Sequence, residues 1–193
     1  MTRNVIEWII AIVVGVIIAI LLSKFVVTKY NVHGSSMYPT FKDGDKLIIN
    51  RMSKNLNTVK RGDVVIFHAT QKRDYIKRLI GKPGDSVRYK KDQLYINGHK
   101  VKEPYLKSNK EATTQRYLTE DTDVSKMKHS GGKKRVPKGK YLVLGDNREV
   151  SIDSRRELGL VNKDRMVGKV MMRWAPLSEM RFKFYPHSFD EVN

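Results

Sequence analysis

Two residues of this chain, a serine in a tight turn and a lysine in an apolar strand, have the chemistry of a nucleophile and a base. Ser36 lies in the run Gly34-Ser35-Ser36-Met37-Tyr38-Pro39-Thr40, where a glycine and a proline favour a tight, exposed segment. Such a segment can present a hydroxyl beside free backbone N–H groups. A serine in a Gly/Pro turn is more often structural, so Ser36 alone does not define a site.

The strand predicted over Tyr75–Ile80 carries two cations, Lys77 and Arg78, on opposite faces, because side chains alternate along a strand. Both faces are otherwise largely apolar, so we expect at least one cation to be buried. Burial lowers the pKa of an amine from its reference value of about 10.4, and a general base must be neutral. Arginine keeps its proton, so Lys77 is the candidate base; the alternative is a lysine that snorkels from an edge strand.

A third candidate segment, Gly145–Arg155, is dense in small polar residues and follows the strand predicted over 141–144. Asp153 and Arg155 are spaced to form an ion pair. Ser151 or Ser154 could donate to a neighbouring group and orient it. The alternative is a loop that bonds to itself for structural reasons only.

Metal and cofactor chemistry are not expected. The chain has no cysteine and no glycine-rich phosphate-binding loop, and its histidines show no ligand spacing. These histidines are scattered along the chain, at His33, His68, His99, His129 and His187.

The elements that must position these residues are short and β-rich, with Gly-Asp and Pro-Gly turns between them. Asn97-Gly98 is a strong hairpin-turn signal. The body is therefore predicted to be mainly β, with strands at 46–50, 64–68, 75–80, 87–89, 94–96, 141–144 and 167–174.

Residues 103–138 differ from the rest of the body in being polar and rich in Lys, Thr and Ser. This composition predicts a surface insertion or small subdomain with a mobile part.

An apolar segment precedes the body. Trp8 to Ser23 is an uncharged run, and with Lys24 snorkelling the apolar span becomes 5–27, long enough to cross a hydrocarbon core of about 30 Å. We expect a retained transmembrane anchor at 5–27 behind a short tail at 1–4. A cleaved signal peptide is the alternative, but the apolar run is long for one and no small-x-small site follows.

The charge of the chain lies almost entirely in the body. Residues 29–193 hold 36 Lys and Arg against 19 Asp and Glu, which is +17 of the formal +18. This balance excludes an ordinary acidic cytosolic enzyme and leaves nucleic acid or an anionic membrane surface as the partner. No nucleic-acid-binding motif accompanies the basic residues, so we expect anionic lipid and no nucleic acid. Positive charges on both sides of the span do not decide its orientation.

Taken together, these pieces resemble the ordered sequence boxes of the bacterial type I signal peptidases. The resemblance runs from the apolar segment to about Trp174, and the single span and short length are similar to the Gram-positive branch. Four stretches carry it, in the family's order: 36–40, Arg61-Gly62-Asp63-Val64-Val65-Ile66-Phe67, 75–85 and 145–155.

The resemblance implies a membrane-bound serine endopeptidase with Ser36 as nucleophile and Lys77 as general base. Ser151 matches the family serine that orients the lysine amine. Asp153 and Arg155 match a supporting ion pair, and Asp146 and Asn147 match its structural frame.

The resemblance also implies how the transition state and the substrate are held. The backbone N–H of Ser36 would be one oxyanion donor. Many Gram-negative relatives have a serine as the second donor where this chain has Gly34, so Ser35 or a water is the candidate here. Shallow pockets for small side chains at positions −1 and −3, the Ala-x-Ala preference, would be lined by Val32, Met37, Tyr75 and Ile76.

The fold implied is a barrel-like antiparallel β core with a smaller inserted extension, forming an extracytoplasmic catalytic domain over 28–193. The expected partners are the signal peptides of secreted preproteins, and the expected location is the cell membrane. Two alternative functions fit the sequence less well. A membrane-tethered basic binding protein does not need both Ser36 and Lys77. Self-cleaving repressors need a DNA-binding helix-turn-helix where this chain has a hydrophobic span.

Overall fold

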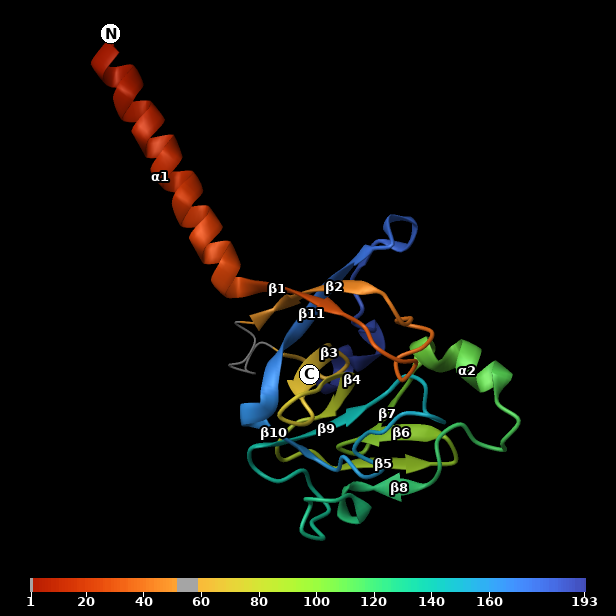
Figure 1. Cartoon of the computed structure of the whole chain (residues 1–193). Helices are drawn as coiled ribbons and strands as arrows, with labels where there is room; N and C mark the ends of the chain where they lie inside the picture. The colour runs from red at the N-terminus through yellow and green to blue at the C-terminus, as the bar shows by residue number, and fades with distance from the viewer. Residues whose placement is uncertain (1, 52–58) are drawn as a thin grey trace.

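The computed structural model of the chain describes residues 2–51 and 59–193, without the side chains of 2–4 and 19–27. A single helix, α1 (Thr2–Val26), projects from a β-rich body (Figure 1). The first strand, β1 (Val27–Asn31), begins directly after it, so the last residue of the expected 5–27 span lies in a strand and most of the expected 1–4 tail is helical.

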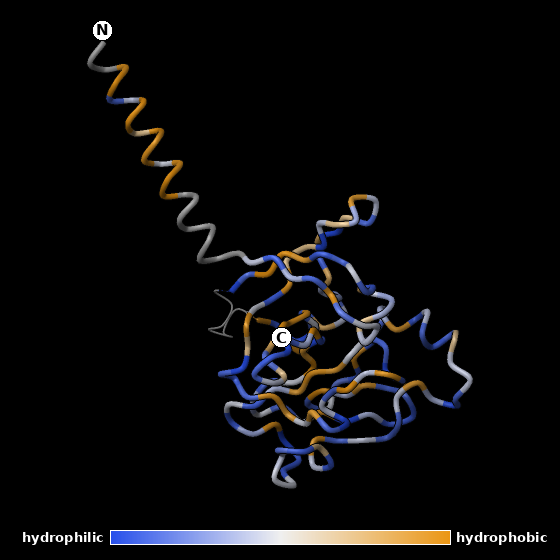
Figure 2. Tube along the Cα trace, viewed as in Figure 1, coloured by the Kyte–Doolittle hydropathy of each residue, from blue (hydrophilic) through white to orange (hydrophobic). Residues whose placement is uncertain are grey.

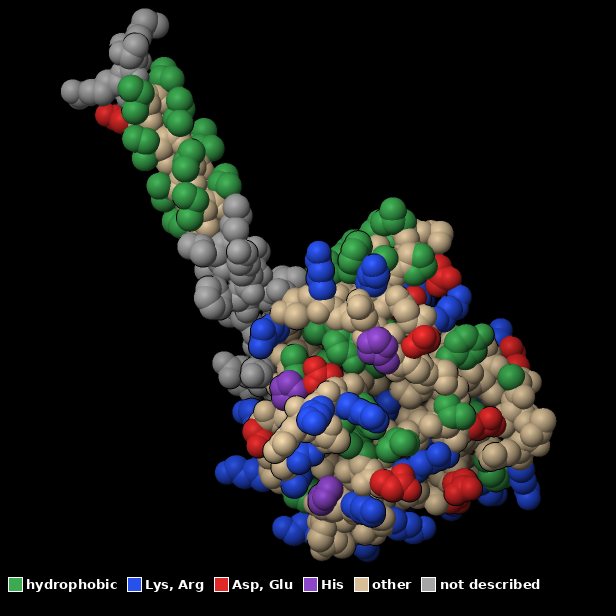
Figure 3. All heavy atoms as spheres, in the orientation of Figure 1, with side chains coloured by type: hydrophobic (Ala, Val, Ile, Leu, Met, Phe, Trp, Pro, Cys, Tyr) green, Lys and Arg blue, Asp and Glu red, His purple; other side chains and the backbone are tan. Residues whose placement is uncertain are grey.

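The described part of α1 exposes its apolar side chains along its length (Figure 3). Among the described residues, no helix contains a stretch long and apolar enough to cross a membrane. The side chains of residues 19–27, which belong to the expected anchor, lie outside the described part of the chain.

The larger of two antiparallel sheets curls into a half-barrel, as expected for a mainly β protein with a barrel-like core (Figure 1). Its strands lie in the order β1-β2-β11-β3-β4-β9-β10, and β12 pairs with β11. After β1, the bounds are β2 (Lys46–Asn50), β3 (Val64–His68), β4 (Asp74–Gly81), β9 (Lys140–Leu144), β10 (Val161–Asn162), β11 (Met166–Ala175) and β12 (Arg181–Phe182).

The smaller sheet has the order β7-β6-β5-β8. Asn97 and Gly98 both have positive φ, 52° and 90°, between β6 and β7. A two-residue hairpin turn of that kind requires this conformation, so the predicted turn is confirmed. The strands are β5 (Val87–Lys90), β6 (Gln93–Ile96), β7 (His99–Val101) and β8 (Thr122–Asp123).

The segment 103–138 belongs to this second unit. It contains the short helix α2 (Lys107–Ala112), two 3-10 turns at Pro104–Leu106 and Val124–Lys126, and β8, which pairs with β5. Apolar side chains anchor it, because Leu106, Val124 and Val136 are all buried. Within this polar stretch, a few apolar residues therefore complete a sheet and its core.

Uninterrupted apolar strands explain how the two sides of the larger sheet are both covered. In β3, Val64 and Ile66 pack into one core cluster while Val65 and Phe67 pack into another, since alternate side chains face opposite ways. The apolar segments accordingly run through the centre of the body, and the polar ones lie outside (Figure 2). The strand β4 is likewise covered on both sides, so its two cations, Lys77 and Arg78, are buried.

A buried arginine joins the smaller sheet to the segment that follows β9. Arg148 is 1% exposed, and its Nη2 donates to Glu103 Oε1 at 2.6 Å. Its Nη1 donates to the Tyr89 hydroxyl at 2.8 Å, and its Nε donates to the Gly145 carbonyl at 2.9 Å. One guanidinium therefore ties β5 and the start of the 103–138 segment to the loop that begins at Gly145.

We expect Arg148→Ala to lower the free energy of unfolding by about 3–5 kcal/mol, because it strands the buried Glu103 carboxylate without its cation. The measurement is chemical denaturation of the full chain in detergent. Arg135→Ala is the matched control: this exposed arginine donates to the Gly84 carbonyl, and its loss should cost under about 1 kcal/mol. Equal effects of the two substitutions would contradict the role given to Arg148.

Candidate active site

The loop that carries Ser36 connects β1 to β2 and is fixed on both sides of the serine. Gly34 has φ of +82°, a conformation that glycine adopts without strain, and its N–H donates to Asp43 Oδ1 at 2.7 Å. Beyond the serine, the N–H of Tyr38 donates to the Ser35 carbonyl at 3.0 Å. The hydroxyl of Ser36 is thus presented from a tight turn, as its sequence predicts.

Lys77 lies in β4 and reaches Ser36 across the cleft. Its side chain is buried, at 3% exposure for the residue, and Nζ donates to Ser36 Oγ at 2.6 Å. Its neighbour Arg78, on the other face of the strand, is 1% exposed. The prediction that at least one cation is drawn inward is confirmed, and in fact both are.

The surroundings of the Lys77 amine favour its neutral form. Burial lowers the pKa of Lys77 from 10.5 to about 8, against the opposing charges of Asp153 and Asp146. The free energy needed to deprotonate Lys77 is therefore roughly 3 kcal/mol lower than for a lysine in water. A lysine with this pKa is a competent base near neutral pH, and a hydroxyl already lies at hydrogen-bond distance.

Asp146 is held by the second buried cation. Arg78 Nη2 donates to Asp146 Oδ2 at 2.6 Å and Nε donates to Oδ1 at 3.0 Å, a two-pronged contact between fully buried groups. The Thr40 hydroxyl donates to the same carboxylate at 2.5 Å. Because Thr40 belongs to the Ser36 loop, Asp146 connects that loop to β4.

Asp153 and Arg155 form the ion pair that their spacing predicts. Arg155 Nη2 donates to Asp153 Oδ2 at 2.8 Å, and the Gly145 N–H donates to the same oxygen at 3.1 Å. Burial alone would raise the pKa of Asp153, but the hydrogen bonds and charge of Arg155 hold that pKa below its usual value. The carboxylate is therefore ionised and closes the 145–155 loop onto itself.

The same loop touches Ser36 directly. The N–H of Asn147 donates to the Ser36 carbonyl at 3.0 Å, and a Cβ added to Gly145 would lie 2.5 Å from that carbonyl oxygen. The added Cβ would also lie 2.2 Å from Ser151 Oγ, so Ser151 lies beside Gly145, next to the backbone of Ser36. Ser151 is buried, and its hydroxyl has no hydrogen-bond partner within the described part of the chain.

A cavity of about 240 Å³ opens over Ser36 and Lys77. Gly34 and two of the four residues predicted to line the substrate pockets, Tyr75 and Ile76, lie on its wall. The other two, Val32 and Met37, are 1% exposed and pack with Ile76 in a core cluster instead of lining this cavity. Ser35, the candidate second oxyanion donor, also lies on the wall, whereas sequence reasoning missed the remaining lining residues: Tyr30, His33, Asp74, Val150 and Ile152.

Two of the missed residues had a visible signal. Val150 and Ile152 flank Ser151 as two apolar residues in a segment that is otherwise dense in small polar and charged residues. They are 54% and 47% exposed and form an apolar edge of the cavity. No three His, Asp or Glu side chains come together to hold a metal ion in the residues that the structure describes.

Comparison with known proteins places this geometry in context. Residues 5–175 match the family model described as signal peptidase, peptidase S26. The chain is 46% identical to Signal peptidase IB of Staphylococcus aureus (strain MRSA252) over 189 residues, covering 97% of this chain and 98% of the relative. It is also 46% identical to Signal peptidase I T of Bacillus subtilis (strain 168) over 181 residues, covering 93% and 90%.

The fold has a solved counterpart. The crystal structure of a signal peptidase I from Enterococcus faecalis V583 superimposes with a TM-score of 0.53 at 36% sequence identity, and it covers 58% of this chain and 97% of the solved one. The similarity therefore holds for sequence and for fold.

The charge balance around Lys77 predicts the effect of removing one carboxylate. We expect the Lys77 amine to titrate near pH 8 in the intact protein, and at lower pH in Asp153→Asn, because the Asp153 charge raises the pKa of the amine. Side-chain NMR of labelled lysine, with Lys77 assigned by its loss in Lys77→Met, measures both values. Asp164→Asn, a substitution outside this network, should leave the titration unchanged. An upward move in Asp153→Asn would contradict the assignment.

Proposed function

This chain belongs to the peptidase S26 family of signal peptidases, and we propose that it cleaves signal peptides from secreted preproteins with Ser36 as nucleophile and Lys77 as general base. The family makes it a serine-type signal peptidase. The observation that carries the residue assignment is the 2.6 Å contact between Lys77 Nζ and Ser36 Oγ, in a cavity where burial lowers the pKa of the amine.

The proposed reaction moves one proton back and forth. Neutral Lys77 takes the proton from Ser36 Oγ as the oxygen attacks the scissile carbonyl. The protonated amine then gives that proton to the leaving nitrogen of the mature chain, and an acyl-enzyme on Ser36 remains. A water molecule then gives a proton to the neutral Lys77 amine and attacks the ester carbonyl. As the ester C–O bond breaks, Lys77 returns that proton to Ser36 Oγ, and the signal peptide leaves with a free carboxylate.

The developing oxyanion needs preorganised donors. We assign the first to the backbone N–H of Ser36. Gly34 offers no hydroxyl, and its N–H already donates to Asp43, so it is not the second donor. Ser35 lines the same cavity, and its hydroxyl is the candidate for that place.

The supporting residues have separate tasks in this proposal. Ser151 would orient the lysine amine, using a buried hydroxyl that has no other hydrogen-bond partner among the described residues. Asp153 with Arg155, and Asp146 with Asn147, would hold the 145–155 loop against Ser36.

The Ala-x-Ala preference is proposed from the resemblance to the family. Tyr75 and Ile76, which border the cavity over Ser36 and Lys77, would limit the space for the side chain at position −1. Val32 and Met37 pack in the same core cluster as Ile76, so they would set the depth of such pockets.

We further propose that residues 5–27 anchor the enzyme in the cell membrane as a single span, with the catalytic domain on the extracytoplasmic side. The apolar run from Trp8 to Ser23 supports an anchor, and signal-peptide cleavage supports the side. The strongly basic body supports contact with anionic lipid.

Substitution of either catalytic residue should abolish cleavage. We expect Ser36→Ala and Lys77→Met each to reduce cleavage of a preprotein with an Ala-x-Ala site by at least about a thousandfold, since nucleophile and base act as a unit. The assay uses the full chain in detergent or lipid, with N-terminal sequencing of the product. Lys100→Met, at an exposed lysine of the smaller sheet, is the control, and cleavage that survives both substitutions would remove the mechanism.

The pH profile tests the protonation state. Because Lys77 must be neutral and its pKa is about 8, kcat/KM should rise with pH through about 8 and level off above it. Activity that falls between pH 7 and 9 on a stable enzyme would contradict a lysine base.

A further inference from the structure

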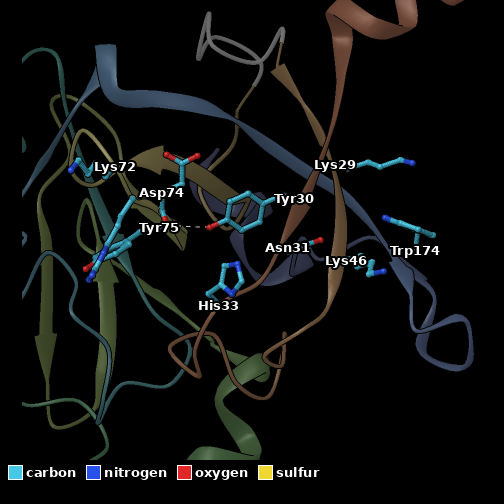
Figure 4. Close-up of a pocket in the computed structure, with 10 residues that line it drawn as sticks. Lys29, Tyr30, Asn31, His33, Lys46, Lys72, Asp74, Tyr75 and Trp174 are labelled. Carbon is cyan, nitrogen blue, oxygen red and sulfur yellow. Dashed lines mark hydrogen bonds between the residues drawn. The ribbon is translucent and has the colours of Figure 1, made fainter.

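A second and larger cavity, of about 1030 Å³, adjoins the one over Ser36. The two share four lining residues, Tyr30, His33, Asp74 and Tyr75, so they form one continuous depression. Figure 4 shows the larger cavity between β1 on one side and the start of β4 on the other. We call it the basic groove, and its other lining residues are Lys29, Asn31, Lys46, Lys72, Arg73 and Trp174.

The charge of the basic groove is unbalanced. Four cations, Lys29, Lys46, Lys72 and Arg73, line it with one carboxylate, Asp74. That carboxylate is already engaged, because His68 Nδ1 lies 2.6 Å from Asp74 Oδ1. Within the described residues, no Asp or Glu oxygen lies within ion-pair distance of any of the four cations.

The cations stand on two opposite walls. Lys29 and Lys46 lie over the ring of Trp174, with Nζ 5.4 and 5.7 Å from the ring centroid. Lys72 and Arg73 belong to the turn between β3 and β4 and are exposed. The groove can therefore place positive charge on both sides of a chain that runs through it.

The edge strand β1 determines how an extended peptide can lie in the groove. Among the described strands β1 pairs only with β2, so its other edge is available to an added strand. Tyr30 points inward, where its hydroxyl donates to the Asp74 carbonyl at 3.1 Å, whereas Lys29 and Asn31 are exposed on the outer face. A strand added to β1 alternates in the same way.

We propose that the basic groove is a second recognition site for the substrate, which binds acidic side chains N-terminal to the −3 position. The inference rests on the function proposed above. If side chains −1 and −3 point inward beside Ile76 and Tyr75, the even-numbered positions −4 and −6 point to the outer face, where Lys29 lies. Tyr75 lies at the boundary of the two cavities, so the chain upstream of −3 enters the groove.

The test compares two versions of one Ala-x-Ala preprotein, with Glu or with Gln at both −4 and −6. We expect the full-length enzyme in detergent to cleave the Glu version with a kcat/KM about five-fold higher at low salt. The preference should fade at about 0.5 M salt, because exposed charges are screened. A ratio near one at low salt would overturn the proposal.

Two variants decide whether the groove causes the preference. In Lys29→Gln/Lys72→Gln the Glu-to-Gln ratio should fall to about one, whereas Lys90→Gln/Lys100→Gln, exposed lysines of the smaller sheet, should keep it. In Lys29→Glu/Lys72→Glu the enzyme should instead favour a substrate with Lys at −4 and −6. The ratio within each enzyme is the readout, so a general loss of activity cancels.

The same experiment separates this proposal from its alternatives. If the Lys29→Gln/Lys72→Gln enzyme keeps the wild-type ratio but sediments less with phosphatidylglycerol vesicles, the groove binds lipid and the proposal is wrong. If the intact enzyme cleaves both versions equally, the groove proposal fails while the proposed function stands. If it cleaves neither, both fail.

Discussion

Burial of the Lys77 amine is the constraint on which the other parts of the site depend. Burial away from water favours the neutral amine. The nearby carboxylates of Asp153 and Asp146 oppose this effect, because their negative charge favours the protonated amine. Each carboxylate is already paired with an arginine, Asp146 with Arg78 and Asp153 with Arg155. Because the arginines offset much of that negative charge, desolvation remains the dominant influence on the lysine. The two ion pairs thus help to keep the Lys77 amine neutral without hydrogen bonding to it.

The ion pairs also explain why the smaller sheet matters to a site that lies in the larger one. Arg78 and Asp146 join β4 to the loop after β9, and Arg148 joins that loop to Tyr89 and to Glu103. The loop after β9 is therefore held by β4 through Asp146 and by the smaller sheet through Arg148. A site that needs one lysine to stay within 2.6 Å of one hydroxyl requires such support on more than one side.

The strands with a clear apolar pattern were predictable from the sequence. All seven predicted strands are present, with their ends within one residue. The strand β1 was not predicted, because its first residue continues the composition of the apolar segment before it. β8, β10 and β12 have two residues each and depend on pairing with partners distant in the chain, which local pattern does not contain.

In the site too, features within one segment were predictable from the sequence, whereas contacts between distant segments were not. Local spacing predicted the Asp153–Arg155 pair and the buried cations of β4. The pairing of Arg78 with Asp146 and the burial of Val32 and Met37 below the cavity were not predictable, since each depends on how separate segments meet in space. The resemblance to a family named the candidate residues, but the geometry shows which of them touch.

The hydrogen bond from the Asn147 N–H to the Ser36 carbonyl joins main chain to main chain. No substitution at position 147 other than proline removes its donor, so the link between this loop and Ser36 tolerates changes of side chain there. Gly145 has no such freedom, because a Cβ would meet both Ser36 and Ser151. Val150 and Ile152, exposed at the cavity edge, carry none of this support. Changes at these two side chains would therefore reshape the edge of the cavity while Ser36 and Lys77 stay in place.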